Sequence, residues 1–204
     1  MVPKIWPEKL DGGRPAEKGV TLVELMFVCV VLAIIAGLAI PNIRQISASY
    51  KLDAAGHSVS SLLQQARIQA VQTNLPVYVN SSNGSVNMAF ITNDPNNTTY
   101  TAGSPDVALA STVSFQPPPA TNGFHTQLDT YLGGGTPNSG SIGFNARGLP
   151  CTGTTNVCTA APGSGGFEWF LQSNAGWEAV TVTASGRIKT WRLSSQSGGN
   201  YSWQ

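Results

Sequence analysis

A single carboxylate, Glu24, lies at the start of the most apolar segment of this 204-residue chain. No charged residue occurs between Leu25 and Pro41, and the next charge is that of Arg44. As a helix, residues 20–40 would be about 31 Å long at ~1.5 Å per residue, which matches the ~30 Å hydrocarbon core of a bilayer. A carboxylate costs ~2.5–3.5 kcal/mol at the centre of such a helix and less near its end, and it is usually functional.

A secretory signal peptide is the alternative explanation of this segment. Charged residues precede it, and Gly37-Leu38-Ala39 has the small residues of a cleavage site. Glu24 argues against this alternative, because a disposable signal has no use for a costly carboxylate. We therefore predict a transmembrane helix over residues 20–41. We expect the N-terminus of this helix to stay in the cytoplasm, because four basic residues lie within residues 1–19. Everything after Pro41 is then exported.

The stretch Gly19-Val20-Thr21-Leu22-Val23-Glu24-Leu25 resembles the class III leader-peptide site of type IV pilins and type II secretion pseudopilins. The resemblance implies that a prepilin peptidase cleaves after Gly19 and methylates the amine of Val20, where the family usually has Phe. It also implies that Glu24 pairs with the N-terminal amine of a neighbouring subunit during assembly. Pro41 matches a proline that kinks the helix in many pilins. The partners implied are the prepilin peptidase, other pilins and the inner membrane.

Four residues near the C-terminus could bind nucleic acid: Arg187, Lys189, Trp191 and Arg192. They fall in a predicted hairpin that turns at Ala184-Ser185-Gly186 and places Ile188 toward the core. We expect Arg187, Lys189 and Trp191 to be exposed on the opposite face, where a basic pair beside an aromatic ring suits a phosphate backbone. The segment resembles the Gly-Arg-x-Arg motif of DNA-binding FimT-like minor pilins, with Lys189 in place of the second Arg. The alternative is a solvated edge strand whose charges block aggregation.

Two of the three cysteines are close together in the exported part of the chain. Cys151 and Cys158 are separated by a short polar loop, which predicts a disulfide in an oxidising compartment worth about 2–3 kcal/mol. A metal site would need more ligands than this loop offers, because His57 and His125 are isolated in the sequence. Cys29, inside the apolar segment, is interpreted as a small packing residue.

Composition and charge exclude several functions. Charged residues make up 10% of the chain, and removing residues 1–19 leaves seven basic and seven acidic residues, so no global field attracts nucleic acid or acidic lipid. Ser58, Ser60 and Ser61 follow His57 without an acidic partner, and the glycine-rich segments lack the Lys of a phosphate loop. We therefore predict no catalytic residues, no cofactor, no metal and no enzymatic activity.

The elements that must position these residues are a helix and several strands. Apolar residues at three- and four-residue steps predict an amphipathic helix over residues 42–74, with Gly56 as a weak point and an end before Pro76. The stripe consists of Leu52, Ala55, Val59, Leu62, Leu63, Ala66 and Ala70. Strands are predicted at 76–80, 85–92, 107–116, 141–147, 166–171, 178–183 and 187–193.

Two further segments resemble a subgroup of this superfamily. Gln65-Ala66-Arg67-Ile68-Gln69-Ala70 with Thr73-Asn74-Leu75-Pro76-Val77, and Ser141-Ile142-Gly143-Phe144-Asn145-Ala146-Arg147-Gly148, are similar to segments of the H-type pseudopilin and FimT minor-pilin group (GspH/FimT). The resemblance implies an α+β, pilin-like fold, in which a long N-terminal helix packs on an antiparallel β-sheet domain. Residues 93–140 contain no motif that we can assign to a family.

The predicted organisation is a leader (1–19), a membrane and assembly helix (20–41), an amphipathic helix (42–74) and a periplasmic β-rich domain (75–204). The predicted function is that of a minor pilin or pseudopilin, a structural subunit of the inner membrane that primes or caps a type IV pilus or a type II secretion pseudopilus. The alternative is a FimT-like tip pilin that binds DNA for uptake through its C-terminal hairpin. Pilus and pseudopilus share the same N-terminal physics, so the sequence does not separate them.

Overall fold

The computed structural model describes residues 19–83, 87–97, 99–117, 126–134, 140–154, 157–160, 165–197 and 200–204. It divides into two compact units, Met1–Pro41 and Asn42–Gln204. The helix α1 (Leu22–Thr73) contributes to both units. The predicted leader lies outside the described residues except for Gly19, as do His125 and the start of the strand predicted at 85–92.

In the first unit, α1 begins at Leu22 because Thr21 caps it. The backbone N–H of Glu24 donates a hydrogen bond to Oγ1 of Thr21 at 3.2 Å, which satisfies one of the free N–H groups of the first turn. Threonine followed three residues later by glutamate is the sequence pattern of a capping box. Pro41 lies within α1, and the kink implied there stays a prediction.

Within the described part of the chain, the structure contains no helix with both the length and the apolarity that crossing a membrane requires.

In the second unit, α1 buries the predicted apolar stripe. All seven residues of the stripe are at most 6% exposed, so the amphipathic pattern is confirmed. The helix ends at Thr73 because Asn74 adopts a left-handed conformation (φ 55°) and Pro76 follows two residues later. The predicted end is therefore correct to within one residue.

The strands of the second unit form two antiparallel sheets. The first consists of β1 (Val77–Asn83), β2 (Asn87–Thr92), β3 (Asp106–Ala108), β5 (Ile142–Phe144), β6 (Pro150–Thr154) and β7 (Val157–Ala160). The second consists of β4 (Ser114–Gln116), β8 (Phe167–Ser173), β9 (Gly176–Val182), β10 (Ile188–Ser197) and β11 (Asn200–Trp203). Their orders are β3-β2-β1-β5-β6-β7 and β11-β10-β9-β8-β4.

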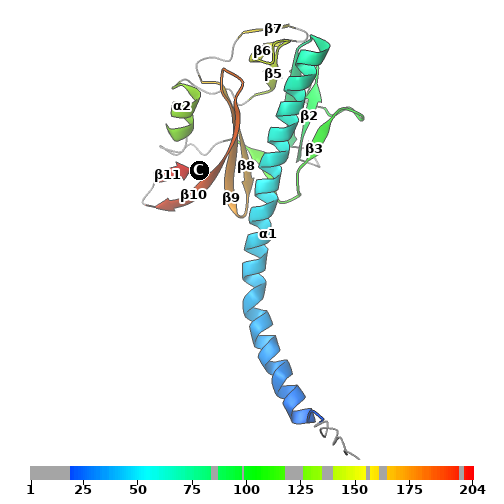
Figure 1. Cartoon of the computed structure of the whole chain (residues 1–204), viewed down its shortest axis with the longest axis vertical. Helices are drawn as coiled ribbons and strands as arrows, with labels where there is room; N and C mark the ends of the chain where they lie inside the picture. Colours follow the sequence, from blue (N-terminus) through cyan, green and yellow to red (C-terminus); the bar gives the residue numbers. More distant parts are fainter. Residues whose placement is uncertain are drawn as a thin grey trace, which may run out of the picture. The chain divides into compact units, whose positions relative to one another are not determined.

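Two groups of buried residues hold this unit together. The larger one packs the apolar stripe of α1 against strands of both sheets. The smaller one lies between the opposite face of β8–β11 and the short helix α2 (Thr126–Leu132), so these strands pass between α1 and α2 (Figure 1). Every described residue of both groups follows Asn42, so the unit Asn42–Gln204 has a hydrophobic core of its own.

The sequence prediction missed α2, the β6–β7 hairpin and β11. Helix α2 has only two buried residues, Leu128 and Leu132, which is too short a pattern to reveal an amphipathic helix. The strand predicted at 107–116 is wrong as a single element. It divides into β3, which pairs with β2, and β4, which pairs with β8 in the other sheet.

Candidate assembly and binding sites

The predicted processing site precedes α1. Gly19 and Val20 are exposed, and a Cβ atom built on Gly19 would meet no atom within 4 Å. The side chain of Glu24 is exposed in the first turn of α1, where the partial positive charge of the helix N-terminus stabilises a carboxylate.

The C-terminal hairpin is formed as predicted, by β9, β10 and a tight turn between them. Gly186 has φ 84°, a conformation that favours glycine, and its N–H donates to the carbonyl oxygen of Thr183 at 2.8 Å. Ile188 pairs with Val182, and both face the α1 side of the sheet. Arg187, in the turn, is exposed.

Trp191 is not exposed, which corrects the sequence prediction. It is 6% exposed, its ring meets that of Tyr131 edge to face at 4.8 Å, and its indole N–H donates to Oγ1 of Thr181 at 2.8 Å. Lys189 lies above it, with Nζ 3.3 Å from the centre of the Trp191 ring. The strand β11 pairs with the later part of β10, from Leu193 to Ser197. The face that alternation predicted to be solvated is covered by α2, which contributes Tyr131.

Arg192 does not lie with the other candidate nucleic-acid-binding residues. Alternation places it on the α1 side of β10, where its Nη1 contacts both carboxylate oxygens of Asp53 at 2.7 and 2.8 Å. It is thus the β10 partner of an ion pair with α1. Of the four predicted residues, Arg187 is exposed and Lys189 half-buried, while Trp191 and Arg192 are engaged within the domain.

A buried carboxyl group beside this ion pair was not predicted. Glu178, on β9 opposite Arg192, is 4% exposed, and its Oε2 has no hydrogen-bond partner among the described residues. Burial, and to a lesser extent Asp53, raises the pKa of this carboxyl to about 8, while Arg192 opposes the shift. The carboxyl lies against Gly56 of α1, where a Cβ atom would overlap it. The mid-helix glycine was the signal in the sequence, since it leaves room for this group.

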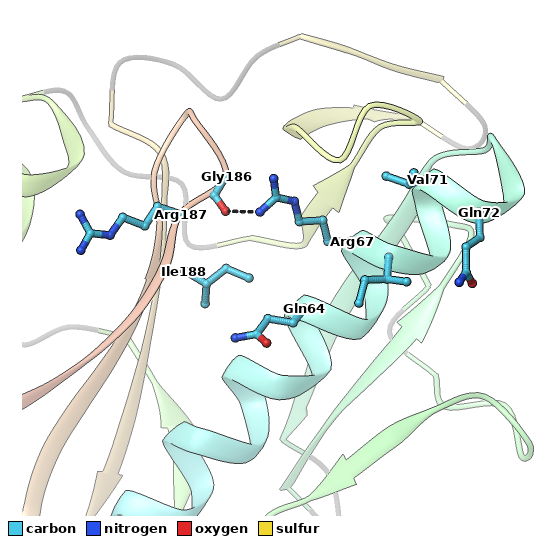
Figure 2. Close-up of a pocket in the computed structure, with 8 residues that line it drawn as sticks. Gln64, Arg67, Val71, Gln72, Gly186, Arg187 and Ile188 are labelled. Atoms are coloured by element: carbon cyan, nitrogen blue, oxygen red, sulfur yellow. Dashed lines mark hydrogen bonds between the residues drawn. The ribbon is translucent and has the colours of Figure 1, made fainter.

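A groove of about 570 Å³ lies between α1 and the β9–β10 turn. Its lining includes Ile68 and Val71 from α1 and Ile188 from β10. Arg67 extends from α1 toward the turn, and its Nη1 donates a hydrogen bond to the carbonyl oxygen of Gly186 at 3.1 Å (Figure 2). The guanidinium of Arg187, which also lines the groove, points away from Arg67 (Figure 2). Its Cζ lies 5.9 Å from the centre of the Tyr131 ring.

The predicted disulfide is confirmed. Cys151 on β6 and Cys158 on β7 are bonded, with their Cα atoms 5.5 Å apart. The bond closes the hairpin at the end of the first sheet, where β7 pairs with β6. Cys29 is free and exposed in the single chain.

Comparison with protein families gives two matches. Residues 14–40 match the prokaryotic N-terminal methylation motif, and residues 55–200 match the type II transport protein GspH. The second match covers most of the chain. The chain belongs to the GspH family. Membership confirms the resemblance to pseudopilins that the N-terminal motif and the later segments indicated.

Two further comparisons, with solved structures and with curated sequences, do not extend the family assignment. The crystal structure of the type IV minor pilin FimU of Pseudomonas aeruginosa superimposes with a TM-score of 0.40 and 14% sequence identity, over 71% of this GspH-family chain and 90% of FimU. A search of curated protein sequences found no match.

Family membership fixes the broad class of this protein. GspH proteins are structural pilins or pseudopilins rather than enzymes, and the family is membrane-anchored and exported. The methylation motif implies processing by a prepilin peptidase, and the family implies assembly with other pilins. For a GspH-family subunit, the exposed Gly19–Val20 bond and the first turn of α1 are therefore the candidate assembly site.

Proposed function

We propose that this protein is a minor pseudopilin of a type II secretion system, anchored in the inner membrane by residues 20–41 and exported beyond Pro41. The observation that supports this most is a methylation motif at residues 14–40 followed by a GspH domain at residues 55–200. The apolar run supports the membrane anchor, because residues 25–41 contain no charge.

Cleavage after Gly19 supplies the chemistry of assembly. It frees the amine of Val20, one residue before the cap of α1. The N-terminus of each mature subunit then carries this positively charged amine and, in the first helical turn, the carboxylate of Glu24. In a bilayer, where the dielectric constant is low, an amine of one subunit and a carboxylate of the next attract each other strongly. The pair forms only between subunits that are in register along the filament.

Mass spectrometry of the protein from cells that contain a prepilin peptidase tests the processing step. We expect a mature chain that starts at Val20 with a methylated amine. A chain that starts at Ile40 would show an ordinary signal peptide and would refute the proposal.

Substitution of Glu24 tests the assembly step. Glu24→Gln keeps the size of the side chain and removes its charge, so it should leave membrane insertion intact and block incorporation into the pseudopilus. Glu24→Asp keeps the charge and is the matched control, which we expect to retain partial incorporation. Normal assembly of the Gln variant in a complementation assay would contradict the proposed pairing.

The proposal includes a role in priming or capping the filament. A subunit that primes assembly acts once per filament, so deleting this chain should reduce the number of pseudopili per cell and leave the length of the remaining ones unchanged. Counting filaments by electron microscopy, with the major pseudopilin overproduced, measures both quantities. Filaments of normal number but reduced length would indicate a subunit distributed along the shaft.

DNA binding remains a second candidate function, supported by the exposed cation Arg187 and by Lys189 next to it on the hairpin. Two cations neutralise at most about two phosphates, so log affinity should fall with log salt at a slope of about −1.8 or shallower. A fluorescence titration of residues 42–204 with duplex DNA should show weak binding that Arg187→Glu abolishes. Lys51→Glu, the same charge change on an exposed residue of α1, is the control. Equal effects of both substitutions would indicate a net-charge effect without a site.

A further inference from the structure

We propose that the groove between α1 and the β9–β10 turn binds a segment of a partner protein in which aliphatic side chains alternate with carboxylates. An aliphatic side chain of the partner lies between Ile68 and Ile188, and a neighbouring carboxylate accepts hydrogen bonds from Arg67. The groove lies entirely within the unit Asn42–Gln204, so it is a different site from Gly19, Val20 and Glu24, which belong to the first unit.

The apolar lining of the groove favours a polypeptide. Ile68 is 56% exposed and Val71 is 51% exposed, and Ile188 lies half-buried opposite them on the hairpin. Neighbouring exposed aliphatic residues in a concave surface are typical of interaction sites. Covering them removes apolar surface from water, which stabilises a complex. A phosphate backbone offers no aliphatic surface for such contacts.

The charge of the groove favours an acidic partner. None of the described residues that line it is acidic, and Arg67 brings a permanent positive charge beside the isoleucines. One N–H of its guanidinium is used by Gly186 at 3.1 Å, which leaves further N–H groups for a carboxylate.

The side chain of Arg67 is also held in place before any partner arrives. Gly148, in the turn after β5, lies so close that a Cβ atom there would be 3.1 Å from Nε of Arg67. Together with the bond to Gly186, this contact fixes the guanidinium from two turns, so little conformational freedom is lost on binding. Arg187 also lines the groove, but its guanidinium points away from Arg67 (Figure 2) and lies 5.9 Å from the centre of the Tyr131 ring.

The test is an NMR titration of residues 42–204 with two peptides, acetyl-Leu-Asp-Ile-Asp-amide and its neutral counterpart acetyl-Leu-Asn-Ile-Asn-amide. We expect saturable shifts at Ile68 and Ile188. The acidic peptide should bind about tenfold more tightly, because the guanidinium of Arg67 makes charge-assisted hydrogen bonds to a carboxylate and not to an amide. Arg67→Gln keeps a donor for Gly186 and should remove the preference between the peptides. Ile68→Gln, an exposed substitution that does not touch the core, should weaken both about equally.

Two control variants lie on the same helix. Ile46 is 54% exposed and Lys51 is exposed. They lie about 33 Å and about 26 Å from Ile68 along α1, at ~1.5 Å per residue, so Ile46→Gln and Lys51→Gln match the two test substitutions without touching the groove. Equal binding of the two peptides by the unsubstituted domain, or binding of neither, would overturn the proposal. So would dimerisation of the domain that Ile68→Gln abolishes, which would make a second copy the occupant. Displacement of the peptide by duplex DNA in an Arg67-dependent manner would also overturn it.

Discussion

The substitution Glu178→Gln tests the structure where a buried carboxyl meets α1. Glu178 is 4% exposed, its Oε2 has no hydrogen-bond partner among the described residues, and its pKa is raised to about 8. Glutamine has nearly the same shape but no charge. The variant therefore removes the titration of this site and leaves the packing against Gly56 in place.

The magnitude follows from the difference between the folded and unfolded pKa values. With a folded pKa of about 8 and an ordinary value of 4.5, the folded protein holds a proton that the unfolded chain releases. The free energy of unfolding therefore falls as pH rises from about 4.5 to about 8, and it is level again above that window. At ~1.4 kcal/mol per pKa unit the fall has a ceiling of roughly 5 kcal/mol. Water near the half-exposed Arg192–Asp53 pair screens part of this interaction, so we expect about 1–3 kcal/mol.

The assay is urea unfolding of residues 42–204, with and without Glu178→Gln, at several values between about pH 5 and pH 9. Contributions from groups that do not contact residue 178 are common to both proteins and cancel in the difference. The advantage of the Gln variant should grow by about 1–3 kcal/mol from the lowest to the highest pH. A difference that stays constant with pH, or that shrinks as pH rises, would refute the reasoning.

Three further substitutions test the packing of the domain by urea unfolding. Gly56→Ala should destabilise the domain by about 1–3 kcal/mol, although Ala favours helices by ~1 kcal/mol, because its Cβ atom would overlap the Glu178 carboxyl. Combining it with Glu178→Ala should recover most of this loss, and additive effects would contradict the contact between the two residues. Cys151→Ser should lower the free energy of unfolding by roughly 2–3 kcal/mol relative to the oxidised protein. Relative to the reduced protein, which is the control, it should change little. Trp191→Ala should cost about 3–5 kcal/mol and Arg187→Ala nearly nothing, whereas similar small effects would mean that Trp191 is exposed after all.

Features that depend on neighbouring residues in the chain were predicted from the sequence. The apolar stripe from Leu52 to Ala70 repeats with the period of a helix, so every one of its buried positions was identified correctly. The stop at Thr73 follows from Asn74 and Pro76, and the disulfide follows from the short sequence separation of Cys151 and Cys158. The Gly19 to Glu24 segment likewise identified the superfamily, which the family matches then confirmed.

Features that depend on distant segments were decided by the tertiary structure. Alternation along β10 correctly separated Ile188 from Trp191, but a pattern with a period of two says only which residues share a face. Whether that face meets water depends on α2, which lies about sixty residues earlier in the chain and brings Tyr131 over the Trp191 ring. In the same way, Asp53 and Arg192 acquire each other as partners only because α1 packs across β9 and β10, with Glu178 beneath Gly56. Burial, ion pairing and the pKa of a carboxyl are properties of these long-range contacts, so they belong to the folded molecule rather than to any local stretch of its sequence.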